Sequence, residues 1–216
     1  MKKVIILSLL CVLVVKANPL FFLVGPATVA APTTVSDDFN RADGAIGSNW
    51  TVINDSSYAV VASNVATTPT SAAYPNCIYA STFTFTANQF SRATMVRSND
   101  TSGQAIELTV RGSGSSLATL SNYAVTISSA GWGMYKMVNG TELALSSGTD
   151  TGSDAFNTGD VCELRVIGTS ITLYKNGTLL TTCTDSSVST GKPGFNLVSN
   201  NSAAQAAIDN WVGGNL

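Results

Sequence analysis

Short apolar segments separated by polar turns run through the whole sequence, and this pattern constrains the fold more than any other feature. Residues 105–110 and 123–127 alternate apolar and polar side chains, as strands with one buried face do. Asn139-Gly140 and Asn176-Gly177 are strong signals for two-residue hairpin turns. No stretch shows a capped helical period over three turns. Strands at such short intervals predict an antiparallel β-sandwich, of the jelly-roll kind.

Other segments have the same character. Residues 83–85 and 90–95 predict two strands around a corner at 88–89, and the Gly/Ser-rich stretch 111–121 predicts a flexible loop. Gly168-Thr169 predicts the turn between two strands of a meander that continues through Asn176-Gly177. Further strands are expected at 58–62, 77–80, 132–138, 142–145, 160–167, 170–175, 194–198 and 206–212.

The first segment of this body, residues 35–52, predicts a strand, a tight corner and a second strand. Phe39, Ile46 and Trp50 are its large apolar anchors, and we expect them in the core together with Trp211. The glycines between the anchors suit a corner because glycine adopts backbone angles that other residues resist.

The same segment resembles the opening of concanavalin A-like, or laminin G-like, β-sandwich domains. The resemblance is carried by Asp37-Asp38-Phe39-Asn40-Arg41-Ala42-Asp43-Gly44 followed by Gly47-Ser48-Asn49-Trp50, and it continues at 159–166, 176–177, 189–195 and 207–211. Openings of this form are familiar from secreted bacterial proteins and from structural proteins of tailed bacteriophages. The resemblance implies an all-β, antiparallel two-sheet jelly-roll sandwich over residues 35–216, preceded by an apolar N-terminal segment.

Residues 1–34 form that apolar leader and its tether. Lys2-Lys3 followed by the apolar run 4–15 has the form of a secretory signal, with a possible cleavage site after Ala17. A second apolar patch at 20–24 favours the alternative, a retained segment that packs into a neighbouring subunit or anchors in a membrane. Both interpretations stay open on the sequence.

The composition excludes several classes of function. Charged residues make up only 11% of the chain and the net charge is -2, so no basic field is present to bind nucleic acid. Histidine is absent, which removes the usual general base and the usual zinc ligand.

Three of the four cysteines, Cys77, Cys162 and Cys183, lie in the body, and this odd number argues against a disulfide framework. If Gly168-Thr169 and Asn176-Gly177 are both two-residue turns, Leu164 faces Leu173 and Leu173 faces Leu180. Cys183 then pairs near Ser170, and its side chain lies on the opposite sheet face from that of Cys162. We therefore predict no Cys162–Cys183 bond and expect Cys162 to be a small core residue.

Glycoside hydrolysis on a related jelly roll needs two carboxyl groups, about 5 Å apart in retaining enzymes. The family pattern for them is Glu-x-Asp-x-x-Glu, and the sequence lacks it. Glu107, Glu142 and Glu163 each stand alone on a strand, where we expect them on solvated faces. The sequence therefore predicts a protein that is not an enzyme and has no organic cofactor.

The resemblance implies two binding sites. Jelly rolls of this class hold glycans on an aromatic platform with amide and hydroxyl donors, and Trp132, Tyr135 and Asn139 are the expected exposed set. Some laminin G-like domains bind calcium through carboxylates and carbonyls. Here the carboxylates would be Asp37, Asp38, Asp43 and Asp209, which converge if the first and last strands are neighbours.

We expect a structural or decoration protein of a virion, anchored by its N-terminal segment, whose sandwich touches glycans. The alternative is a secreted, signal-cleaved carbohydrate-binding or adhesion protein, and a glycoside hydrolase is a third class. The expected partners are copies of itself, other virion or surface proteins, and glycans. A membrane is a partner only if the leader is a retained anchor. The expected location is therefore a virion surface or the extracellular space.

Overall fold

A computed structural model of the chain describes residues 34–54, 59–68, 76–80, 82–97, 104–128, 130–149, 155–199 and 206–216. The signal-peptide and anchor hypotheses fall on the leader, of which all residues before Thr34 lie outside the described part. Within the described part of the chain, no helix has the length and hydropathy to span a membrane.

The described residues form two antiparallel sheets. One contains β1 (Thr34–Asp37), β2 (Gly44–Ala45), β4 (Val60–Ala62), β5 (Val65–Thr67), β7 (Gln89–Arg97), β12 (Val161–Ile167), β13 (Ser170–Lys175), β14 (Thr178–Thr184) and β16 (Ala206–Asn215). The other contains β3 (Trp50–Ile53), β6 (Asn76–Tyr79), β8 (Gln104–Ser113), β9 (Ser121–Ser128), β10 (Gly131–Val138), β11 (Thr141–Thr149) and β15 (Lys192–Ser199). One turn of 3-10 helix, η2 (Leu117–Thr119), joins β8 to β9.

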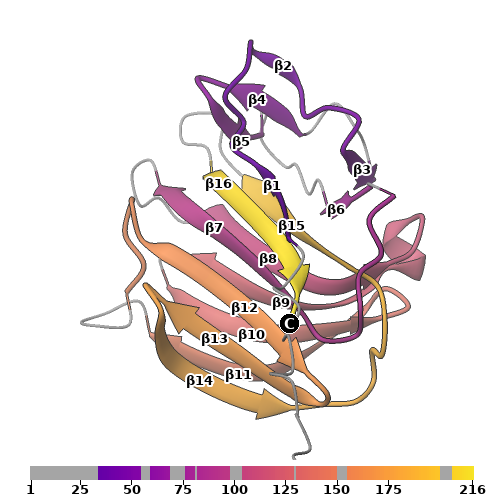
Figure 1. The fold of residues 1–216 in the computed structure, drawn as a ribbon. Coiled ribbons are helices and arrows are strands. Elements are labelled where there is room, and N and C mark those ends of the chain that lie inside the picture. The colour runs from indigo at the N-terminus through magenta and orange to yellow at the C-terminus, as the bar shows by residue number, and fades with distance from the viewer. Residues whose placement is uncertain are drawn as a thin grey trace, which may run out of the picture. The chain divides into compact units, whose positions relative to one another are not determined.

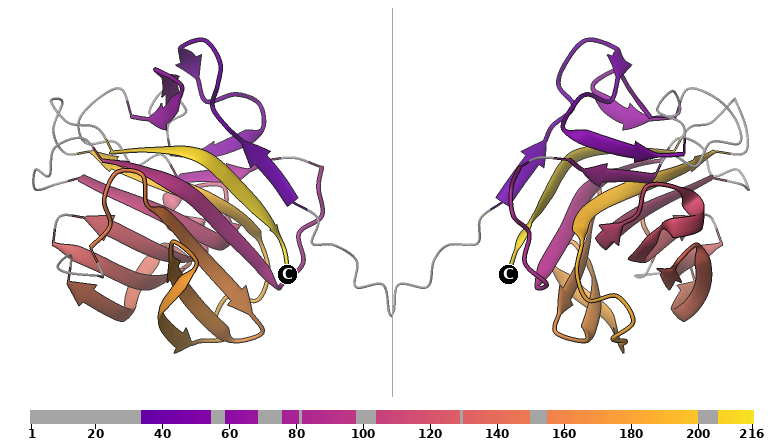
Figure 2. Two further views of the ribbon diagram at one scale, coloured as in Figure 1. Left: turned by 60° about the vertical axis from the view of Figure 1, so that its left-hand side comes forward. Right: turned by 90° about the vertical axis from the view of Figure 1, so that its right-hand side faces the viewer.

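The nine-stranded sheet has the order β14-β13-β12-β7-β16-β5-β4-β2, with β1 also paired to β16. The seven-stranded sheet has the order β11-β10-β9-β8-β15-β6-β3. The two sheets lie as separate layers, and the strands of each run side by side (Figures 1 and 2). This arrangement confirms the predicted all-β jelly-roll sandwich.

One hydrophobic core fills the space between the sheets. Phe39, Leu164 and Leu173 are 0% exposed and Trp50 is 6% exposed, and all four belong to the same buried cluster. They come from both sheets, because alternate side chains of each strand point to the same interior. Trp211 is 0% exposed in the same cluster, as predicted.

The opening stretch links the two layers. β1 pairs with β16 in the nine-stranded sheet, with Asp37 opposite Trp211, whereas β3 begins at Trp50 in the seven-stranded sheet. The ring centroid of Trp50 lies 4.6 Å from those of Phe195 and Trp211. The predicted strand, corner and second strand are therefore confirmed, and the corner also contains β2.

Two expectations about local structure are wrong. Residues 82–88 form no strand, and a single strand, β7, begins at Gln89. The hydroxyl of Thr86 donates to the Asn88 carbonyl, and the side-chain amide of Gln89 donates to the Thr86 carbonyl. Side chains thus bind backbone carbonyls that would otherwise pair with a neighbouring strand. Within 111–121, β8 runs on to Ser113, η2 follows, and Leu120 is 0% exposed, so this stretch packs against the sheet.

The register around the cysteines also differs from the prediction. Leu164 faces Leu173 as expected, but a bulge after Leu173 places it opposite Thr181. Cys183 consequently faces the buried Ile171 and packs against the core. The thiols of Cys162 and Cys183 are free, and β13 separates their strands, a spacing of two inter-strand distances. Cys162 is 0% exposed in the core, as predicted.

Candidate functional site

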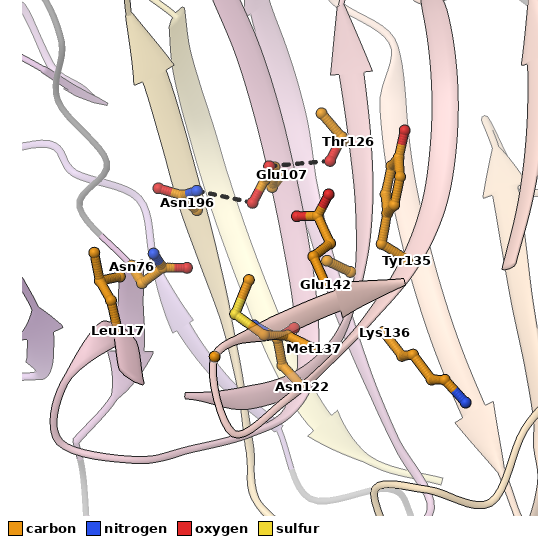
Figure 3. Close-up of a pocket in the computed structure, with 12 residues that line it drawn as sticks. Asn76, Glu107, Leu117, Asn122, Thr126, Tyr135, Lys136, Met137, Glu142 and Asn196 are labelled. Carbon is orange, nitrogen blue, oxygen red and sulfur yellow. Dashed lines mark hydrogen bonds between the residues drawn. The ribbon is translucent and has the colours of Figure 1, made fainter. Parts of the chain in front are cut away.

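A hollow of about 300 Å³ lies on the face of the seven-stranded sheet that points away from the core (Figure 3). Strands β8, β9, β10, β11 and β15 carry most of its lining, and η2 and the β10–β11 turn form one end. Its polar and aromatic lining residues are Asn76, Glu107, Asn122, Thr126, Tyr135, Lys136, Glu142 and Asn196.

The residues at the centre of the hollow are positioned by the alternation of side chains along each strand and by the register between strands. Glu107 on β8 lies between the buried Ile106 and Leu108, so its side chain leaves the sheet on the outer face. Its direct cross-strand partners are Asn196 on β15 and Thr126 on β9. The three side chains therefore stand in one row across the sheet.

Hydrogen bonds fix the carboxylate of Glu107 in that row. Its Oε2 accepts a hydrogen bond from Asn196 Nδ2 at 2.8 Å, and its Oε1 accepts one from Thr126 Oγ1 at 3.0 Å. Asn196 is only 4% exposed, and its Oδ1 has no hydrogen-bond partner among the described residues. The row thus presents an oriented carboxylate to the hollow, and the Asn196 amide oxygen behind it is buried without a donor among the described residues.

The electrostatics of the hollow are acidic. Burial raises the pKa of Glu107, and the negative charge of Glu142 raises it further, against the opposing effect of the hydrogen bonds from Asn196 and Thr126. Lys136 also lines the hollow, but its Nζ contacts Asp185 Oδ2 at 2.5 Å. Figure 3 shows this lysine side chain directed away from the two glutamates.

Apolar residues close the end of the hollow that lies at η2 and the β10–β11 turn. The N–H of Gly140 in the β10–β11 turn donates to the Leu120 carbonyl at 2.9 Å, which ties this turn to the end of η2. Ile53, Ile78 and Leu120 form a second small buried cluster, and Met137 packs against it. This cluster holds η2 on the outer face of the sheet and so closes the hollow at one end.

The three predicted glycan-binding residues are not one exposed set. Trp132 is 7% exposed, pairs with Ile127 and belongs to the core, so its expected exposure is corrected. Tyr135 lies on the outer face and lines the hollow. The reason is parity, since residues three apart on a strand point to opposite faces. Asn139 is exposed in the hairpin turn beside the hollow, with a φ of 47°.

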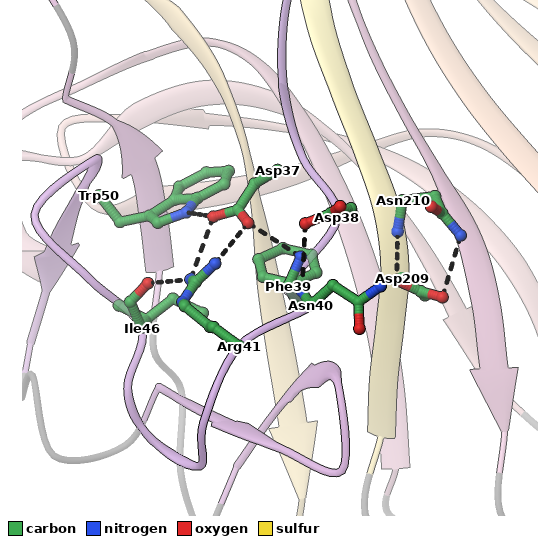
Figure 4. A network of polar contacts seen from close by, with 9 residues as sticks. All are labelled: Asp37, Asp38, Phe39, Asn40, Arg41, Ile46, Trp50, Asp209 and Asn210. Carbon is green, nitrogen blue, oxygen red and sulfur yellow. Dashed lines mark hydrogen bonds and ion pairs between the residues drawn. The ribbon is translucent and has the colours of Figure 1, made fainter.

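The first predicted calcium ligand, Asp37, has other partners (Figure 4). It accepts hydrogen bonds from Arg41 at 2.6 and 3.1 Å, from Trp50 Nε1 at 2.8 Å and from the Phe39 N–H at 2.9 Å. Burial alone would raise the pKa of Asp37, but these donors outweigh it and hold the pKa below its usual value. Its oxygens are thus occupied by protein donors.

The other predicted calcium ligands do not converge either. Asp38, Asp43 and Asp209 each accept a hydrogen bond from a backbone N–H close by. β1 and β16 are indeed neighbours, as the hypothesis required. Even so, no three Asp, Glu or Cys side chains of the described residues are grouped to hold a metal ion. The predicted calcium site is therefore not formed by these residues.

One statement about the glutamates is corrected. Glu107 and Glu142 stand alone on β8 and β11, as expected, and both line the hollow. Glu163 is not on a solvated face: it is 7% exposed and forms ion pairs with Arg92 at 3.6 Å and with Arg165. Alternation alone indicated the outer face for Glu107. The register that brings Glu142 to it was not readable from the sequence.

Comparison with known proteins rests on structure. No protein-family model matches the chain, and no curated protein matches its sequence. Among solved structures, the carbohydrate-binding module CBM66 from Bacillus subtilis has a TM-score of 0.61 at 15% identity, covering 77% of this chain and 95% of that one. The β-glucanase of Bacillus licheniformis has a TM-score of 0.58 at 14% identity, covering 85% of this chain and 98% of that one. The carbohydrate recognition domain of Emp46p has a TM-score of 0.53 at 10% identity, covering 77% and 88%.

The fold is that of the concanavalin A-like sandwiches. This confirms the resemblance found at the opening stretch. At these identities the likeness shows the fold alone, and a fold of this kind hosts many tasks. The function of this concanavalin A-like sandwich therefore depends on the side chains that line its hollow.

Proposed function

We propose that this chain is a carbohydrate-binding sandwich that holds a glycan in the hollow of the seven-stranded sheet without cleaving it. The observation that carries the proposal is the composition of the hollow. The ring of Tyr135 on β10 and the hydrogen-bonded carboxylate of Glu107 on β8 line the same hollow (Figure 3). A sugar packs its apolar face on an aromatic ring and donates its hydroxyl groups to oriented acceptors, so this combination suits it.

The structural neighbours support this class of ligand. Two of them are described as a carbohydrate-binding module and a carbohydrate recognition domain. Others are β-glucanases, so what the descriptions share is contact with carbohydrate.

The setting we propose is a surface. In our first account the chain is a structural or decoration protein of a virion, anchored by its N-terminal segment and in contact with copies of itself or other virion proteins. In the alternative it is a secreted, signal-cleaved carbohydrate-binding or adhesion protein. The intact mass of native material separates the two, since a chain beginning at Asn18 or later contradicts the retained anchor.

Binding to a glycan array, followed by calorimetry on the oligosaccharides that bind, tests the proposal. Tyr135→Ala should weaken binding about tenfold, or about 1.4 kcal/mol, since it removes both the apolar area of the ring and about 1 kcal/mol of aromatic contact beyond that area. Tyr174→Ala is the matched control, because Tyr174 lies on the nine-stranded sheet, where it contacts Arg165. Equal affinity of the two variants, with both folded, would overturn the proposed site.

A glycoside hydrolase is the second candidate, and one observation favours it. Glu107 and Glu142 share the hollow, and a raised pKa such as that of Glu107 is what a general acid requires. Two neighbours are a β-glucanase and a lichenase. We expect no release of reducing ends from β-glucans. Release that Glu107→Gln abolishes would replace the binding role with catalysis.

A further inference from the structure

We infer that the hollow selects a sugar that carries a free, protonated amine, a 2-amino-2-deoxy hexose, over its N-acetylated or neutral counterpart. This inference rests on the proposed function and names the ligand class for the same site. Three features of the hollow lead to it: its unused acceptors, its uncompensated charge and its aromatic ring.

The Glu107 carboxylate in the hollow has unused acceptor positions. Each oxygen of Glu107 accepts only one hydrogen bond from the protein, although a carboxylate oxygen accepts two. Asn196 is 4% exposed, and its buried Oδ1 has no donor among the described residues. The Asn196 amide commits one of its two N–H groups to Glu107, and the Thr126 hydroxyl commits its only O–H. A ligand that binds the remaining acceptor positions of this carboxylate must bring donors, and an ammonium group brings three.

Charge points to the same ligand. Glu107 and Glu142 line the hollow together, and the negative charge of Glu142 disfavours ionisation of Glu107. Lys136 cannot compensate them, because its Nζ lies 2.5 Å from Asp185 and 2.9 Å from the Ser187 hydroxyl. The lining contains no arginine. A single positive charge in the ligand would relieve the repulsion between the two carboxylates.

The aromatic ring favours an amino sugar over a bare metal ion. Tyr135 lines the hollow and offers a face on which a pyranose ring packs and which also attracts a cation. Calcium instead takes six to eight oxygen ligands at about 2.3–2.6 Å. The two carboxylates that line the hollow, Glu107 and Glu142, supply four oxygens, fewer than calcium takes, whereas an ammonium on a sugar needs only three acceptors.

Calorimetry with three tetrasaccharides of one β-1,4 linkage tests the inference: the tetramers of glucosamine, of N-acetylglucosamine and of glucose. At about pH 6, below the ordinary pKa of such amines, the glucosamine tetramer should bind about tenfold more tightly than the other two, which is the order expected of a hydrogen bond between charged groups. Calcium chloride alone should give no binding heat. Calcium binding that displaces the glucosamine tetramer would make the hollow a metal site and overturn the inference.

The outcomes separate this inference from the proposed function. Binding of the neutral tetramers with no gain for the amine overturns the inference and leaves the proposed function standing. Failure of all three tetramers, and of every glycan on the array, overturns both.

Two single-charge variants locate the effect. Glu142 is exposed, so Glu142→Gln should fold normally and reduce the preference for glucosamine over N-acetylglucosamine to about twofold or less. Asp38→Asn removes the same charge from an exposed residue in the loop after β1 and should leave the preference unchanged. An equal loss of this preference in both variants would mean that the overall charge of the protein attracts the glucosamine tetramer. An unchanged preference in Glu142→Gln would mean that Glu142 does not contact the amine. Either result overturns the inference.

Discussion

The indole Nε1 of Trp50 donates a 2.8 Å hydrogen bond to Oδ2 of Asp37, a residue 13 positions earlier in the chain and in the other sheet. The same carboxylate also receives Arg41 and the backbone N–H of Phe39 (Figure 4). One buried acid thus ties the first strand of one sheet to the first strand of the other. The acid, the arginine and the tryptophan of the opening stretch therefore form one structural unit.

Removal of that acid should destabilise the sandwich. Asp37 is 7% exposed and receives four hydrogen bonds, so Asp37→Ala leaves Arg41 and the Trp50 N–H without their partner. We expect the free energy of unfolding in urea to fall by about 3 kcal/mol. Asp38→Ala, at the exposed neighbour, should change it by about 0.5 kcal/mol or less. Equal effects would show that the network contributes nothing beyond surface charge.

The elements that follow from local rules were predictable from the sequence. The turn at Asn139-Gly140 has φ values of 47° and 73°, and that at Asn176-Gly177 has 50° and 79°, as two-residue hairpin turns require. Phe39 and Trp50 lie in the core, as predicted, because burying large aromatic side chains removes much apolar area from water.

The site was less predictable, because it depends on register between strands that are far apart in sequence. Glu107 meets Asn196 across 89 positions, and no local signal fixes that pairing. Bulges add to the difficulty, since one extra residue reverses the face of every residue beyond it. The bulge after Leu173 turned Cys183 inward, contrary to the two-residue turn geometry.

The stability of the chain should fall in acid because of Asp185. Burial would raise the pKa of Asp185, but donors from Lys136, Ser187 and Tyr123 outweigh it and hold the pKa well below its usual value. A depressed folded-state pKa contributes stability above the unfolded value, about 3.9, and this contribution is lost as the pH falls toward the folded value. Urea unfolding at pH 7, 4 and 3 should show a decline below pH 4 that is shallower in Asp185→Asn. An identical decline in that variant would contradict this assignment.

Arg111 should be the most costly arginine to replace. It is 3% exposed, and its guanidinium donates to the carbonyls of Ala87, Gly168 and Val188 at 2.7 to 2.9 Å. Arg111→Met keeps much of the volume but strands three acceptors, so we expect a loss of about 4 kcal/mol in urea unfolding. Arg92→Met, at a side chain that is 43% exposed, should cost about 1 kcal/mol. Similar losses in both variants would mean that the three carbonyls find other donors.

Two glycines that contact aromatic rings should separate binding from stability. A Cβ at Gly133 would lie 2.5 Å from the ring of Tyr135, so Gly133→Ala must push that ring out of its place in the hollow. A Cβ at Gly148 would lie 2.4 Å from the ring of Trp132 in the core. We expect Gly133→Ala to weaken oligosaccharide binding about tenfold with little change in melting temperature, because Tyr135 faces outward. Gly148→Ala should instead lower the free energy of unfolding by about 1–3 kcal/mol through overpacking. If Gly133→Ala binds oligosaccharide as tightly as the unmodified chain while Tyr135→Ala binds it more weakly, the prediction is wrong. Binding would then require the ring of Tyr135 but not its position over Gly133.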